Sequence, residues 1–157
     1  MIGAMATTKT LILGLGNDLL ADDAIGILAA RRLQTRLGER ADVVESSLHG
    51  LALLETFLGY DRALIIDAIQ TGRHPPGTII ELSPEDFRPV DVPSPHFAGL
   101  PEMIALAREL DLPFPARIRI LAVEIANAAV IGGAMTPAVS AALDGVCDRA
   151  AALLDAF

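Results

Sequence analysis

The chain has a single cysteine, Cys147, no tryptophan, and an aromatic share of only 4% among its 157 residues. One cysteine excludes an intramolecular disulfide and a zinc site built on several cysteines. A core with so few aromatic side chains has to be built from alanine, leucine, isoleucine and valine. The sequence also lacks a run of about 18 apolar residues free of charge, so it indicates no membrane-spanning helix and no membrane partner. The first ten residues lack the features of a secretory signal, and we expect a cytoplasmic protein.

Basic residues are scarce as well. The 12 lysines and arginines are outnumbered by 20 aspartates and glutamates, which gives a net charge of −8 and a pI near 4.7. Because an acidic surface repels a phosphate backbone, we expect no nucleic-acid partner. A hydrophobic share of 52% and this length predict one folded domain over residues 1–157. We expect residues 1–9 to be a flexible N-terminus and the protein to be a monomer.

Short apolar runs alternate along the chain with amphipathic segments. The runs predicted as strands are residues 10–15, 41–45, 63–69, 78–82 and 118–124. The segments predicted as helices are residues 22–37, 50–57 and 100–110, and a last helix opened by Thr136 and Pro137. Strands alternating with helices predict an α/β fold with three layers, in which helices cover both faces of a mostly parallel, twisted five-stranded sheet. We expect Asp22 or Asp23 to cap the first helix, and Thr136 to cap the last.

A glycine turn, Gly14-Leu15-Gly16-Asn17, follows the first predicted strand. Such a turn can bind a dinucleotide, but the third glycine of that motif is replaced by Leu19, and Asp22 and Asp23 would place negative charge where a pyrophosphate binds. No phosphate-binding G-K-[ST] sequence follows either. The glycines are equally explained by a tight strand-to-helix turn. We therefore expect no stabilisation of the protein by NAD or ATP.

Polar residues follow the predicted strands at the positions where parallel sheets bind ligands, outside the carboxyl ends of the strands. Asp22 and Asp23 follow the first strand, Asp67 interrupts the third apolar run near its end, and His96 lies in a stiff Pro-Ser-Pro-His loop after the fourth strand. Asp67 could instead cap a turn, and His96 could be an ordinary loop histidine. We interpret the other two histidines, His49 and His74, as surface residues.

Two carboxylates and one imidazole form a mixed oxygen and nitrogen site for a divalent metal. Without a cation, two neighbouring carboxylates repel each other, and a metal relieves this repulsion. Three protein ligands leave coordination positions open. The sequence therefore predicts a metal site at Asp67, His96 and one of Asp22 and Asp23, which the protein alone does not complete.

Four segments of the chain resemble the hydrogenase maturation endopeptidases, and together the resemblance covers nearly the whole sequence. The segments are LGLGN with LADDAIG at residues 13–17 and 20–26, IIDA at 65–68, SPH at 94–96 with GL at 99–100, and LAVE with MTP at 121–124 and 135–137. The first three, in this order and spacing, form a specific signal, whereas any one alone would be weak.

The resemblance implies that Asp23, Asp67 and His96 are catalytic residues that engage nickel already loaded into the precursor of a hydrogenase large subunit. It implies removal of a short C-terminal peptide from that precursor, which is then the protein partner. The nickel is supplied by the precursor, and no tightly bound cofactor of the chain's own is implied. The family often has glutamate where this chain has Asp23, so the metal has to lie closer to the first helix or bind through water. Whether Asp23, Asp67 or a metal-bound water drives hydrolysis stays open.

Familiar protease motifs are missing from the sequence. It contains neither H-E-x-x-H for zinc nor a G-x-S-x-G elbow. Cys147 lies within the last predicted helix and is predicted to be a buried thiol rather than a nucleophile. A non-enzymatic nickel chaperone or sensor that uses the same Asp23, Asp67 and His96 is the alternative hypothesis.

Overall fold

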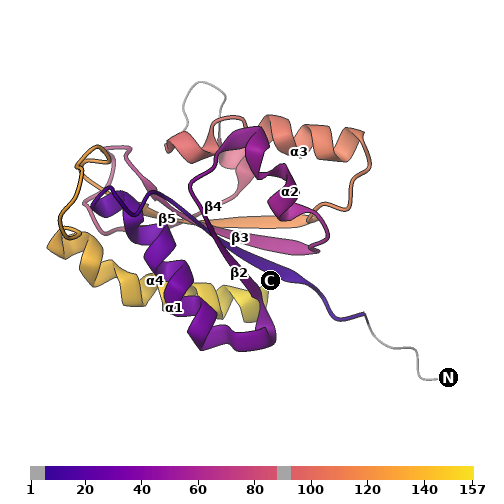
Figure 1. Ribbon diagram of the computed structural model, residues 1–157, viewed down its shortest axis with the longest axis horizontal. Coiled ribbons are helices and arrows are strands. Elements are labelled where there is room, and N and C mark those ends of the chain that lie inside the picture. Colours follow the sequence, from indigo (N-terminus) through magenta and orange to yellow (C-terminus); the bar gives the residue numbers. More distant parts are fainter. Residues whose placement is uncertain (1–5, 88–92) are drawn as a thin grey trace.

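An open five-stranded sheet forms the centre of the computed structural model, which describes residues 6–87 and 93–157 (Figure 1). The strands are β1 (Thr10–Leu15), β2 (Asp42–Ser46), β3 (Arg62–Ile69), β4 (Ile79–Leu82) and β5 (Arg117–Glu124). Their order in the sheet is β2-β1-β3-β5-β4. Strands β2, β1, β3 and β5 are parallel, and β4 is antiparallel to β5. The predicted α/β fold with a mostly parallel five-stranded sheet is therefore confirmed.

Helices cover both faces of this sheet. They are α1 (Ile25–Leu37), α2 (Leu54–Phe57), α3 (Leu100–Glu109) and α4 (Pro137–Ala156). Short 3-10 turns precede or follow them: η1 (Asp22–Ala24), η2 (Gly38–Arg40), η3 (Gly50–Leu53), η4 (Pro84–Asp86) and η5 (Pro95–Phe97). Figure 1 shows α1 and α4 together on one face and α2 and α3 on the other. None of the described helices combines the length and apolarity needed to cross a bilayer.

The two layers of helices define two apolar cores, because successive side chains of a strand point to opposite faces. Ile12 and Leu64 belong to the core under α1 and α4, whereas Leu11, Leu13 and Ile65 belong to the core under α2 and α3. The core under α1 and α4 is almost entirely aliphatic, as the composition predicts, whereas the core under α2 and α3 also contains Phe57, Phe87 and Phe97. Strand β1 is buried over its whole length, and β3 over all but its first residue. Asp67 lies on the same face of β3 as Ile65.

His96 was predicted to reach the site because it follows the fourth strand, which was expected to end at the same edge as the others. This reason is wrong, because β4 is antiparallel to β5. Leu82, at the carboxyl end of β4, pairs with Ile120, four positions before the end of β5. The chain therefore leaves β4 at the opposite edge and has to come back before it reaches His96. A signal for this was present, since residues 70–78 are too few for a parallel crossover, which needs about a dozen.

Strand order reverses between β1 and β3, which is where open α/β sheets form a crevice for ligands. Pairing of β1 with β3 ends at Gly14 and Ile66, while β3 continues beside β5 for three more residue pairs up to Ile69. Asp67 is the first residue of β3 beyond the end of the β1 ladder. One side of its backbone therefore faces the crevice rather than a neighbouring strand.

Smaller differences from the sequence prediction concern turns and ends. Of the predicted flexible N-terminus, residues 1–5 lie outside the described chain, and residues 6–9 are exposed and without regular structure. The backbone of Lys9 is nevertheless held, because its N–H donates to Asp61 Oδ2 at 2.7 Å. The connection between β4 and His96 contains η4, and its residues 88–92 are not described. In α4, Leu154 is buried, whereas its neighbour Leu153 is only partly buried.

Candidate functional site

Two glycines let the first helix approach the ends of β1 and β3 closely enough to form the site. A Cβ atom on Gly26 would lie 2.1 Å from the Leu15 carbonyl oxygen and 2.4 Å from that of Ile66. A Cβ atom on Gly16 would lie 2.2 Å from the carbonyl oxygen of Asp23. Any larger residue at these positions would displace the backbone. The glycines of the first loop are therefore explained by this packing, without a bound nucleotide.

Asp23 is presented by the η1 turn between β1 and α1 and is 6% exposed. Its Oδ2 accepts a hydrogen bond of 3.0 Å from the backbone N–H of Asn17, which ties the turn to the glycine loop. The prediction that Asp22 or Asp23 caps the first helix is wrong, since neither side chain bonds to the helix it precedes. The η1 turn leads into α1 without a side-chain cap, and the carboxylate of Asp23 is directed into the crevice instead.

Asp67 interrupts the apolar run but not the strand. It lies inside β3, within the predicted strand at residues 63–69, and is in register with Ala122 of β5. It is fully buried. Its Oδ1 accepts from the backbone N–H of Ala68 at 2.8 Å, and its Oδ2 accepts from the hydroxyl of Ser94 at 2.6 Å. A buried carboxylate without such partners would be strongly destabilising, so these two bonds explain how the strand tolerates it.

His96 belongs to the short η5 turn, which comes back across the α2 and α3 side of the sheet. The segment before His96 is hydrogen-bonded to the end of β3, because the carbonyl of Pro93 accepts from the N–H of Gln70 at 3.1 Å. Ser94 then accepts from the N–H of His96 at 3.3 Å. The Nδ1 atom of His96 lies 3.1 Å from the carbonyl oxygen of Leu48. If Nδ1 carries the proton, it donates to Leu48 and directs Nε2 toward the carboxylates.

The structure brings Asp23, Asp67 and His96 together. One ligand atom from each lies within 4.8 Å of the others, and all three residues are buried. The Nε2 of His96 is 3.8 Å from Oδ2 of Asp23. Two atoms bound to one ion at about 2.1 Å each can be at most about 4.2 Å apart, so this pair can bind a metal directly. The shorter aspartate at position 23 therefore does not require a bridging water. The third ligand needs only a small side-chain shift.

Burial and mutual charge shift the protonation of this cluster. Burial raises the pKa of Asp67 to about 7, despite the opposing effects of His96 and of the Ser94 hydrogen bond. Burial also lowers the pKa of His96, but Asp23, Asp67 and the Leu48 carbonyl outweigh it and raise the pKa to about 9. Near neutral pH the imidazole is therefore protonated in the absence of a metal. A proton on His96 supplies the positive charge that the two carboxylates need.

Two further residues contribute to the site through contacts that were not predicted from the sequence. Ser94 is 2% exposed and links Asp67 to the backbone of His96. Asp22 is 3% exposed and accepts from both the N–H and the hydroxyl of Thr136, at 2.7 and 2.8 Å. The prediction that the Thr136 side chain caps α4 is therefore wrong. Thr136 instead links η1 to the start of α4. Nothing in the sequence marks a contact between residues so far apart.

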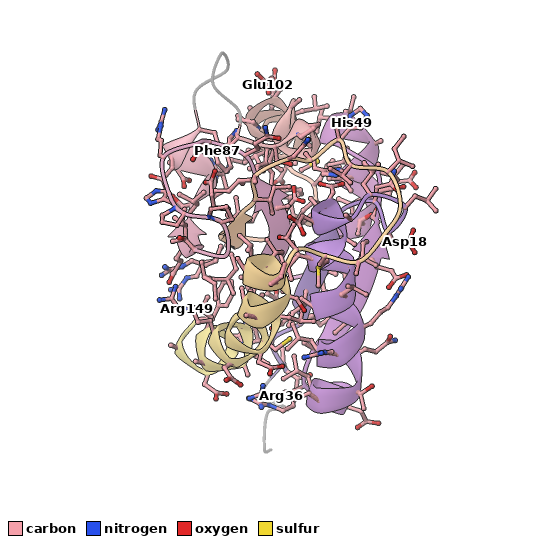
Figure 2. All side chains as sticks on the ribbon, turned by 90° about the vertical axis from the view of Figure 1, so that its left-hand side faces the viewer. Asp18, Arg36, His49, Phe87, Glu102 and Arg149 are labelled. Atoms are coloured by element: carbon pink, nitrogen blue, oxygen red, sulfur yellow. The ribbon has the colours of Figure 1, made fainter. Side chains whose placement is uncertain are left out.

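The remaining candidates lie away from the crevice. Figure 2 faces the edge at which the parallel strands end and shows the labelled His49 at its periphery. His49 and His74 are exposed, as predicted. Cys147 is 4% exposed within α4, which confirms a buried thiol. Within the described residues, Asp23, Asp67 and His96 form the one group of this kind that could hold a metal ion.

The family model and the most similar known sequences point to the same protein family. The sequence model of the HycI family, described as hydrogenase maturation protease, matches residues 27–153. The hydrogenase 2 maturation protease of Escherichia coli K12 is 29% identical over 93% of this chain and 90% of its own length. The hydrogenase expression/formation protein HoxM of Cupriavidus necator is 29% identical over 90% of this chain and 72% of its own length.

Solved structures agree with the sequence relatives. The hydrogenase maturating endopeptidase HybD of E. coli superposes with a TM-score of 0.78 at 27% identity, over 94% of this chain and 93% of its own. The [NiFe] hydrogenase maturation protease HybD of Thermococcus kodakarensis gives a TM-score of 0.73 at 27% identity, over 94% of this chain and 99% of its own. The similarity therefore extends over the whole sheet and the crevice at its edge.

Proposed function

This chain belongs to the hydrogenase maturation protease family and is a peptidase, and we propose that it removes the C-terminal extension of a nickel-loaded [NiFe] hydrogenase large-subunit precursor. The observation that carries the proposal is the meeting of Asp23, Asp67 and His96 in the crevice between β1 and β3. The cytoplasmic location and the monomeric state stay predictions of the sequence.

The nickel belongs to the substrate in this proposal. Two carboxylates and one imidazole leave coordination positions for ligands that the precursor supplies. The charge of the crevice supports transient engagement, because the pKa of about 9 lets His96 carry a proton when no metal is bound. Nickel therefore has to displace a proton, which weakens binding of the free ion near neutral pH. A nickel ion already held by the precursor brings further ligands and marks the subunit as ready for cleavage.

Asp23 and Asp67 have different surroundings, and we assign them different roles. Both oxygens of Asp67 accept hydrogen bonds and the residue has no exposed surface, so it suits the fixed position of a metal ligand. For Asp23, Oδ2 accepts from Asn17, while the described residues provide no hydrogen-bond donor to Oδ1. Asp23 is also 6% exposed and borders a cavity, so a water molecule and a peptide can reach it.

Hydrolysis then needs a group that accepts the proton of the attacking water. In our proposal Oδ1 of Asp23 accepts this proton as the water oxygen bonds to the scissile carbonyl carbon. The proton passes to the leaving amide nitrogen, the C–N bond breaks, and the extension departs with a free amino terminus. His96 and Asp67 keep the nickel-bearing part of the substrate in place. Proton transfer by a positioned carboxylate contributes roughly 10²–10⁴-fold to such rates.

The test is cleavage of a nickel-loaded precursor by the purified protein, followed by the mass of the large subunit. We expect cleavage by the wild type, no cleavage of the metal-free precursor, and loss of cleavage for Asp23→Asn, Asp67→Asn and His96→Ala. Replacement of the exposed histidine, His74→Ala, is the matched control and should leave cleavage unchanged.

Nickel binding separates the roles of the carboxylates. Asp67→Asn should lose binding, whereas Asp23→Asn, whose amide oxygen can still take the ligand position of Oδ2, should retain part of it while cleavage stops. Continued cutting by Asp67→Asn without nickel binding would overturn the role of Asp67. Nickel binding by the wild type without cleavage of any loaded precursor would favour the chaperone or sensor hypothesis.

A further inference from the structure

A cavity of about 380 Å³ opens directly beside the metal-ligand cluster. Asp23 and Ser94 line the end of the cavity that adjoins the cluster. The remaining lining residues are Ala68, Ile69, Gln70, Pro93, Pro95, Ile125 and Ala128. The cavity therefore shares a wall with the cluster but extends away from it, along the carboxyl ends of β3 and β5.

Gln70 holds both walls of this cavity in place. Its backbone N–H donates to the carbonyl of Pro93 at 3.1 Å, and its side-chain Oε1 accepts from the backbone N–H of Ala128 at 3.0 Å. The loop before His96 and the loop after β5 are thus fixed across the space between them. A cavity with both walls hydrogen-bonded to one residue keeps its shape before a ligand arrives, which lowers the entropic cost of binding.

The lining is apolar apart from Gln70, Ser94 and the carboxylate of Asp23. Ile69 and Ile125 are each 2% exposed and form part of the floor, and the two prolines offer no N–H donor. None of the described lining residues is cationic, so a carboxylate on the substrate would be buried in the cavity without a cationic partner in the lining, which costs free energy. The chemistry of the lining therefore favours an uncharged aliphatic side chain.

We propose that this cavity receives the first residues of the C-terminal extension, immediately beyond the cleaved bond, and selects an aliphatic side chain there. The inference rests on the proposed function. If the cluster engages the nickel of the precursor, the residues before the bond belong to the folded body of the large subunit. Only the extension is then free to enter a cavity in the protease. The cavity adjoins Asp23, the group assigned to the attacking water, so a chain entering it crosses the point of cleavage.

A filled cavity tests the inference on the protease side. Ala128→Phe places a ring into the cavity, and Ala129→Phe adds the same ring to an exposed neighbour that does not line it. We expect Ala128→Phe to lower kcat/KM for the nickel-loaded precursor at least about tenfold, the scale of a hydrophobic-pocket contact. Nickel binding and Tm should stay close to those of the wild type. Ala129→Phe should cut normally, and equal cutting by both folded variants would overturn the inference.

Changes in the extension give a second test that needs no altered protease. Each of the first three extension residues is replaced in turn by alanine, leucine and aspartate, and the wild-type protein is the enzyme. We expect one position at which aspartate slows cleavage at least about tenfold relative to leucine. At that position alanine should restore part of the activity of Ala128→Phe, because a smaller side chain fits the filled cavity. This test also decides the matter if Ala128→Phe does not fold, since Ala128 also contacts the core under α1 and α4.

The outcomes separate the two proposals. If the wild type cleaves the precursor but all three positions accept aspartate and leucine equally, the cavity assignment is wrong and the proposed function stands. If the wild type leaves every loaded precursor intact, the proposed function fails, and the cavity assignment fails with it.

Discussion

Replacement of the buried carboxylate, Asp67→Asn, should change the stability of the protein in opposite directions at low and at high pH. In the folded protein the pKa of Asp67 is about 7, compared with 3.8 for an ordinary aspartate. The folded state therefore binds this proton more tightly than the unfolded state. The resulting stabilisation is fully present below about pH 4 and is lost as the pH rises through 7.

The size of the effect follows from the shift. Each pKa unit corresponds to about 1.4 kcal/mol, so a shift of roughly three units removes on the order of 4 kcal/mol of the wild type's free energy of unfolding. Asparagine carries no charge and does not undergo this loss. Its amide instead imperfectly replaces the acceptors for Ser94 and Ala68, at a cost of about 1–3 kcal/mol at every pH. We therefore expect Asp67→Asn to be less stable than the wild type near pH 4.5 and more stable near pH 7.5.

Urea unfolding followed by circular dichroism measures this directly, with a chelator present so that metal does not contribute. The comparison ends at pH 7.5 because His96, with a pKa of about 9, is still protonated there. A stability difference between variant and wild type that stays constant within about 0.5 kcal/mol from pH 4.5 to 7.5 would refute the reasoning, since the predicted change is several times larger.

Three further predictions concern the surroundings of the site. Ser94→Ala removes the hydroxyl that donates to Asp67 and should weaken nickel binding by roughly tenfold or more, whereas Ser94→Thr should keep most of the binding. Titration calorimetry measures both variants, and a Ser94→Ala affinity equal to that of the wild type would contradict the role of Ser94. Gly26→Ala places a Cβ atom 2.1 Å from the Leu15 carbonyl oxygen and should cost more than about 4 kcal/mol, so a Tm near that of the wild type would disprove the close approach of α1. Nickel affinity should rise from pH 6 to 9, because the raised pKa values of Asp67 and His96 require protons to leave as the metal binds; calorimetry at several pH values would show a flat affinity if this is wrong.

The parts of the fold that the sequence predicts are those governed by local pattern. Strands β1, β3 and β5 each contain a short aliphatic run, at residues 11–13, 63–66 and 120–123, and such runs are typical of strands buried on both faces. The first helix ends at residue 37, as predicted, where Gly38 follows with a positive φ of 55°, and Pro137 opens α4, as the sequence indicated. The direction of β4 depends instead on pairing across the sheet. It could have been inferred only from the short connection after Ile69.

The candidate site is predictable in part for the same reason. Asp67 stands out because a carboxylate inside an aliphatic run needs an explanation, and His96 stands out because prolines stiffen the loop that presents it. Ser94 and Asp22 have no such signal, since serine and aspartate are common in loops. Their importance comes from tertiary contacts, with Asp67 and with Thr136 respectively. The assignment of catalytic and metal-binding roles stays a prediction.

The most direct test of the account is a crystal of the protein soaked with Ni²⁺, or with Cd²⁺ as a substitute, and measured for anomalous scattering. We expect one strong peak in the crevice between β1 and β3, within bonding distance of Asp23, Asp67 and His96. Peaks only at the exposed histidines, or a crevice ion that contacts fewer than two of these side chains, would contradict it.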